Sequence, residues 1–141
     1  MATTRTAHTV WNGNLAEGSG VVSFDSSGIA DQAVSWPARS EEPGGRTSPE
    51  ELIAAAHSSC FSMALSHGLA GNGTPPSRLT TQASVTFQPG TGITGIHLTV
   101  EGEVPGLDEA GFTAAAADAA RNCPVSQALA GTTITHEAKL A

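Results

Sequence analysis

The chain has no tyrosine, and aromatic side chains make up only 4% of its 141 residues. Small side chains, chiefly alanine and glycine, take their place, so each core residue buries less apolar surface. A core shared between two copies of the chain would be larger, and we expect dimerisation on this ground. The length predicts a single domain over residues 1–141.

Basic residues are also scarce, with six Lys and Arg against 13 Asp and Glu and a formal net charge of -7 at pH 7. Without a basic stripe to contact phosphates, nucleic-acid binding is excluded. No apolar run approaches the ~20 residues that a membrane-spanning helix needs, and residues 1–6 lack the apolar core of a signal peptide. The sequence therefore predicts a cytoplasmic protein without a membrane or nucleic-acid partner.

Cysteine occurs twice, as Cys60 and Cys123. A single buried cysteine is most often an inert core residue. In the cytoplasm, however, structural disulfides are rare, and a disulfide is more often transient and catalytic. One cysteine that reacts and one that resolves is the minimum for disulfide-cycle redox chemistry. The pair, in a chain with no other cysteine, therefore favours a redox function.

Hydrophobic periodicity and turn residues predict an α+β fold in the order ββ(β)–α–ββ–αα–β. The first three strands fit a meander, and residues 37–48 are expected to form a loop. The expected strands cover 6–13, 18–25, 32–36, 79–88, 93–104 and 132–139. The expected helices cover 49 to about 69, 107 or 108 to about 121, and 124–130.

The long helix has a strong start, because Ser48 can be the N-cap, Pro49 suits the first helical position and Glu51 completes a capping box. Cys60 lies in mid-helix, far from the helix dipole, so its thiolate needs a nearby cation. Cys123 opens the next helix and gains from the positive helix end. The positions expected to form the buried face of the long helix are Leu52, Ile53, Ala56, Cys60, Met63, Ala64 and His67.

Two further interpretations use the same side chains. His57 lies three positions before Cys60 and could assist its thiolate, although a single histidine is more often structural. Together with His67, these two residues and Cys123 could instead bind zinc, but the chain has neither a CxxC nor an HExxH motif.

Residues 48–65 (SPEELIAAAHSSCFSMAL) resemble the central helix of the OsmC/Ohr family of thiol peroxidases. Residues 122–126 (NCPVS) resemble the second cysteine motif of that family, and residues 10–14 (VWNGN) are similar to its OsmC, or osmotically inducible, branch. The context of His57 and Met63 favours the same branch. The resemblance implies an OsmC-like fold, with antiparallel sheets wrapped around long central helices in an intertwined homodimer.

The resemblance also implies roles for individual residues. Cys60 matches the peroxidatic cysteine, which becomes a sulfenic acid, and Cys123 matches the resolving cysteine. Glu50 matches the activating glutamate, and Arg39 matches the activating arginine, with Arg46 as a weaker contender. Implied substrates are organic hydroperoxides and hydrogen peroxide. A dithiol, such as a lipoylated protein, would reopen the disulfide, and no metal or organic cofactor is needed.

Glu50 and Cys60 are ten positions apart, which is ~15 Å along a continuous helix. Glu50 is therefore expected to act on the thiol of the other subunit, unless the helix begins later than predicted. The competing function is that of a non-catalytic, stress-related binding protein of the same fold, in which the cysteines are structural.

Overall fold

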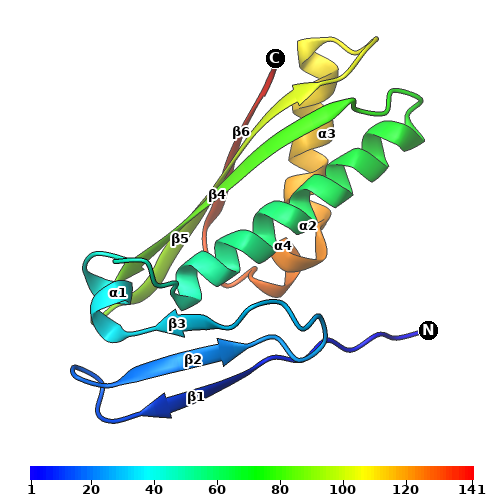
Figure 1. The fold of residues 1–141 in the computed structure, drawn as a ribbon. Coiled ribbons are helices and arrows are strands. Elements are labelled where there is room, and N and C mark those ends of the chain that lie inside the picture. Colours follow the sequence, from blue (N-terminus) through cyan, green and yellow to red (C-terminus); the bar gives the residue numbers. More distant parts are fainter. The chain divides into compact units, whose positions relative to one another are not determined.

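A computed structural model describes residues 1–141 and confirms the α+β class (Figure 1). The chain divides into two compact units, Met1–Leu52 and Ile53–Ala141, which are described in turn. The single domain over 1–141 stays a prediction. None of the helices combines the length and hydropathy needed to cross a membrane.

The first unit contains the predicted meander. Strands β1 (His8–Asn12), β2 (Ser19–Ser23) and β3 (Gln32–Val34) form an antiparallel sheet in that order. The turn after β1 uses the expected Asn-Gly pair, and Gly13 adopts a φ of 93°, which favours glycine. The chain is thus reversed where the sequence predicted.

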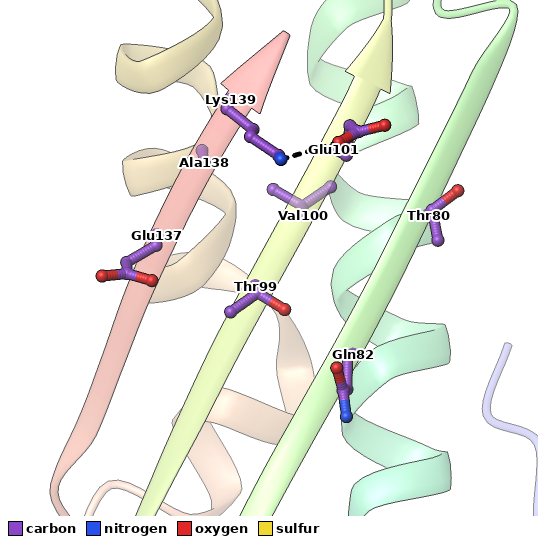
Figure 2. A pocket seen from close by; sticks show the side chains of 8 residues that line it. All are labelled: Thr80, Gln82, Thr99, Val100, Glu101, Glu137, Ala138 and Lys139. Atoms are coloured by element: carbon purple, nitrogen blue, oxygen red, sulfur yellow. Dashed lines mark ion pairs between the residues drawn. The ribbon is translucent and has the colours of Figure 1, made fainter. Parts of the chain in front are cut away.

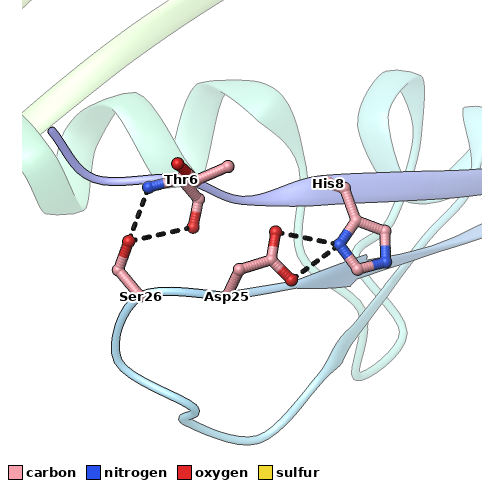
Figure 3. Close-up of polar contacts among 4 residues, drawn as sticks. All are labelled: Thr6, His8, Asp25 and Ser26. Carbon is pink, nitrogen blue, oxygen red and sulfur yellow. Dashed lines mark hydrogen bonds and ion pairs between the residues drawn. The ribbon is translucent and has the colours of Figure 1, made fainter.

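Polar contacts join Thr6, just before β1, and His8, the first residue of β1, to the segment after β2 (Figure 3). The Thr6 backbone N–H donates to Ser26 Oγ at 2.6 Å, and His8 Nδ1 lies 2.8 Å from Asp25 Oδ1. Hydrogen bonding to the Asp25 carboxylate raises the pKa of His8. These contacts extend the pairing of β1 with the chain beyond β2.

A short helix, α1 (Trp36–Ser40), occupies residues 37–40 of the segment predicted as a loop and Trp36 at the end of the predicted strand, so both predictions are wrong at these positions. Ser35 is its N-cap and accepts a hydrogen bond from the Ala38 backbone N–H at 3.2 Å. Pro37 lies in its first turn, where the missing N–H costs nothing. Five residues are too few to show a helical periodicity, but the capping signals are present.

The second unit contains a sheet of β4 (Arg78–Gln88), β5 (Gly92–Glu103) and β6 (Ile134–Leu140) in that order. β4 and β5 form the predicted antiparallel hairpin, whereas β5 and β6 pair in parallel. The parallel pair differs from the antiparallel arrangement that the resemblance implied. Its cause is the connection through α3 (Glu109–Asn122) and α4 (Pro124–Ala128), since a helical crossover returns the chain in the same direction.

Helix α2 (Pro49–Gly71) begins at the predicted residue, and its part from Ile53 onward belongs to the second unit. In Figure 1, α2 and α3 lie on the same face of the β4–β5–β6 sheet. Side chains of α2, α3 and β5 meet in one hydrophobic core. The core residues include Phe61, Leu65, Leu69, Leu98, Val100, Phe112, Ala116 and Cys123.

The buried face of α2 differs from the predicted one. The structure buries His57, Phe61, Leu65 and Leu69, whereas Met63 is 71% exposed. Ala and Ser fill most other positions, so weakly apolar residues surround the helix and periodicity does not select one face. An exposed apolar stripe results, which we call the α2 stripe. It consists of Ala56, Met63 and Ala70.

Candidate active site

The structure brings the two cysteines together. Cys60 lies on α2, and Cys123 lies between α3 and α4. Cys123 is fully buried, and Cys60 is partly buried against the core that contains Cys123. The two thiols, both free, interact with each other through their side chains. A pair predicted from composition alone is therefore also a pair in space.

The surroundings of Cys60 favour the neutral thiol. Burial is the main influence and raises its pKa, and the neighbouring Cys123 thiol raises it further. The Val125 backbone N–H acts in the opposite direction and lowers it. None of these groups carries a positive charge. This agrees with the expectation that a mid-helix Cys60 needs a cation from elsewhere to react as a thiolate.

Cys123 is the N-cap of α4, as predicted, and its sulfur accepts the Ser126 backbone N–H at 3.3 Å. The Ser126 hydroxyl also lies 3.1 Å from this sulfur. Sequence reasoning missed Ser126. It stands three positions after the N-cap, where its N–H is expected to face the capping side chain, and this signal could have found it.

His57 is fully buried, and neither nitrogen of its ring makes a hydrogen bond to Cys60. Its Nε2 lies 2.7 Å from Ser126 Oγ, on the Cys123 side of the thiol pair. Burial lowers the pKa of His57, so the ring is neutral at pH 7. Its other nitrogen, Nδ1, is buried without a hydrogen-bond partner.

Arg39 and Glu50 form an ion pair within the first unit. Arg39 Nε donates to Glu50 Oε1 at 2.8 Å and to Oε2 at 3.1 Å. The short helix α1 carries the arginine, and the first turn of α2 carries the glutamate. The Glu50 side chain is only 8% exposed, against 31% for Arg39. A buried carboxylate thus fixes the orientation of a guanidinium that stays partly accessible.

The neighbouring residues Glu51 and Arg46 do not take part in the Arg39–Glu50 ion pair. The Glu51 carboxylate accepts a hydrogen bond from Thr47 Oγ1 at 2.6 Å. The Glu51 backbone N–H donates to Ser48 Oγ at 3.1 Å. Ser48 is thus the N-cap, as predicted. Arg46 is exposed, so the arginine that pairs with Glu50 is Arg39.

A hollow of about 720 Å³ lies on the side of the β4–β5–β6 sheet turned away from α2 (Figure 2). Six of its eight lining residues have polar or charged side chains, and Lys139 Nζ pairs with Glu101 Oε2 at 3.0 Å. No cysteine lines it, so it is not part of the thiol site. The zinc site considered from the sequence also finds no support, since no cluster of three or more His, Cys, Asp or Glu side chains could hold a metal ion.

Comparisons with known proteins identify the family of the chain. The family model of the OsmC-like proteins matches residues 42–137. Proteins named Peroxiredoxin OsmC from Escherichia coli (strain K12) and Shigella flexneri are each 42% identical over 122 residues, which cover 84% of this chain and 85% of each relative.

Solved structures of similar proteins share the fold. An OsmC-like protein from Mycoplasma pneumoniae has a TM-score of 0.76 at 15% identity, covering 100% of this chain and 99% of its own. The organic hydroperoxide resistance protein OhrB of Bacillus subtilis has a TM-score of 0.68 at 25% identity, covering 96% and 98%. Matched over most of its length by this family model and by relatives of 42% identity, the chain belongs to the OsmC-like family.

Proposed function

We propose that this chain is a cysteine-based peroxidase that reduces organic hydroperoxides, and hydrogen peroxide as well. The observation that carries the proposal is the direct interaction of Cys60 with Cys123, the only two thiols of the chain. The relatives named Peroxiredoxin OsmC support a thiol peroxidase. The similarity to a protein named for organic hydroperoxide resistance supports the substrate class.

In the proposed cycle, the Cys60 thiolate attacks one peroxide oxygen, an S–O bond forms and the O–O bond breaks. The other oxygen leaves with a proton as an alcohol or as water. Cys123 then attacks the sulfenic acid of Cys60, which releases water and forms the disulfide. A dithiol reopens the disulfide in two exchange steps and leaves as its own disulfide. A lipoylated protein is the proposed reductant and the cytoplasm the proposed location, because the cycle needs a reducing compartment.

The cation that Cys60 needs comes, in this proposal, from the Arg39–Glu50 pair of a second copy. Helix α2 begins at Pro49, so Glu50 and Cys60 are separated by ten helical positions, or ~15 Å along the axis. A homodimer would bring the pair of one copy to the thiol of the other. The exposed α2 stripe supports an interface, because a second copy would cover Met63.

The proposal is tested by following the loss of cumene hydroperoxide with dihydrolipoamide as reductant. Wild type should turn over, and Cys60→Ser should abolish turnover because the attacking sulfur is gone. Cys123→Ser should retain a single turnover but cycle poorly with dithiols. An inactive wild type would overturn the proposal and favour the non-catalytic binding protein.

A further inference from the structure

Three buried side chains form a hydrogen-bonded row that ends at the resolving cysteine. His57 Nε2 lies 2.7 Å from Ser126 Oγ, and Ser126 Oγ lies 3.1 Å from Cys123 Sγ. His57 and Cys123 are fully buried, and Ser126 is 5% exposed. The peroxidase cycle described above uses neither His57 nor Ser126. The function of this buried row of side chains at Cys123 is therefore still to be explained.

The direction of the hydrogen bonds follows from the one ring nitrogen without a partner. A serine hydroxyl has a single proton, so Ser126 can donate either to His57 or to Cys123. If His57 carried its proton on Nδ1, that N–H would be a buried donor without an acceptor. Buried N–H groups without a partner are rarer than acceptors without one. The favoured tautomer therefore has its proton on Nε2, and His57 donates to Ser126.

The hydroxyl proton of Ser126 is then left for Cys123. The sulfur of Cys123 faces two donors, the Ser126 hydroxyl at 3.1 Å and the Ser126 backbone N–H at 3.3 Å. Both would stabilise the negative charge that a sulfur takes when a disulfide bond opens toward it. Cys60, by contrast, interacts with one donor, the Val125 backbone N–H, and burial opposes its charge. The two sulfurs of the disulfide are thus unequal.

We propose that His57 and Ser126 are positioning residues that make Cys123 the leaving group when the reductant opens the Cys60–Cys123 disulfide. The reductant thiolate attacks Cys60 Sγ, a mixed disulfide forms there, and the bond to Cys123 breaks with its electron pair on the Cys123 sulfur, which then takes up a proton. The second thiol of the reductant attacks the mixed disulfide, releases Cys60 and leaves as a cyclic disulfide. The proposal rests on the proposed function, since it concerns its recycling step.

The test measures disulfide opening separately from peroxide chemistry. The Cys60–Cys123 disulfide is formed with diamide, and its reduction by dithiothreitol is followed by stopped flow. Ser126→Ala should slow this step about tenfold, because a hydrogen bond to the charged leaving group is lost. His57→Leu should slow it less, because it removes only the group that orients the Ser126 hydroxyl and leaves that hydroxyl able to donate to Cys123. Ser126→Thr keeps the hydroxyl and should restore the rate. Ser59→Ala and His67→Gln, at exposed positions of α2, are the matched controls and should not change it.

Two further readouts separate positioning from folding. With a monothiol such as glutathione, mass spectrometry should find the mixed disulfide on Cys60 in wild type, and partly on Cys123 in Ser126→Ala. In ¹⁵N-histidine spectra of the reduced protein, His57 should be neutral with its proton on Nε2.

An opening rate in Ser126→Ala within twofold of wild type, a wild-type mixed disulfide on Cys123, or a proton on Nδ1 would overturn this inference. Failure of the proposed function looks different. In that case wild type consumes no peroxide, while the diamide-formed disulfide still opens at a rate that depends on Ser126.

Discussion

At the scale of single residues, His57 links the redox site to the stability of the core. Its imidazole is fully buried, and burial lowers its pKa below the ordinary value of 6.5. In the unfolded chain the same ring binds a proton near that value. As the pH falls below 6.5, the unfolded state therefore gains protons that the folded state does not bind.

We predict that the free energy of unfolding decreases as the pH falls from 6.5 toward the lowered pKa of folded His57, and that this contribution is constant above pH 6.5. Urea unfolding at several pH values from 7.5 to 5 measures the effect. His57→Gln should be less stable at pH 7 but should lose less stability on acidification than wild type. Equal losses in the two proteins would contradict a His57 pKa that is lower in the folded state than in the unfolded state.

At the scale of elements, α2 shows which features of the fold the sequence could predict. Its first residue followed from Ser48 and Pro49, because capping is a local interaction between near neighbours. Its buried face did not follow, since alanine and serine surround the helix and Met63 belongs to the exposed side. Periodicity finds a face only when the other side is clearly polar.

Strands and short helices differ in the same way. On β4, the alternation of Leu79, Thr81, Ala83, Val85 and Phe87 was read correctly, because a strand with one solvent-facing side has a period of two. Helix α1 was missed, since five residues make little more than one turn. Yet α1 carries Arg39, so a proposed site residue lies on an element that was not predicted.

The candidate site shows a similar division. Cys60, Cys123, Arg39 and Glu50 were named from residue type and resemblance, and the structure pairs the two cysteines and pairs Arg39 with Glu50. Ser126 could have been found as the residue whose N–H faces the Cys123 cap, but its contact with His57 joins α4 to α2, which are far apart in the sequence. Sequence order identifies local caps, whereas such long-range contacts require the fold.

The α2 stripe makes a prediction at this scale. Met63→Glu places a charge where the proposed homodimer buries an apolar side chain, and it should convert the dimer into monomers. Turnover should fall at least about tenfold, because Cys60 loses the arginine of the second copy. Sedimentation velocity and the peroxide assay measure the two effects. Gln82→Glu, on the exposed side of β4, is the control that should leave both unchanged. A fully active Met63→Glu monomer would contradict the interface.

At the scale of the whole molecule, the chemistry is divided between the two compact units. The Arg39–Glu50 pair belongs to residues Met1–Leu52, and both thiols belong to residues Ile53–Ala141. Within its own unit, Cys60 is partly buried and lies next to a second thiol, and both effects raise its pKa. In the proposed homodimer, activity is therefore a property of the assembly, because each thiol pair uses the ion pair of the other copy.

The central claim is that Cys60 is a peroxidatic thiol activated by the Arg39–Glu50 pair of a second subunit. A mixed dimer of one Cys60→Ser chain and one Glu50→Gln chain, purified through two different tags, tests it most directly. If the proposal holds, one site combines an intact Cys60 with an intact Glu50 from the other chain, and about half of the wild-type turnover of cumene hydroperoxide returns. Each mutant homodimer should be inactive or nearly so. A mixed dimer as inactive as the two homodimers would contradict the claim, because each Glu50 would then serve the Cys60 of its own chain.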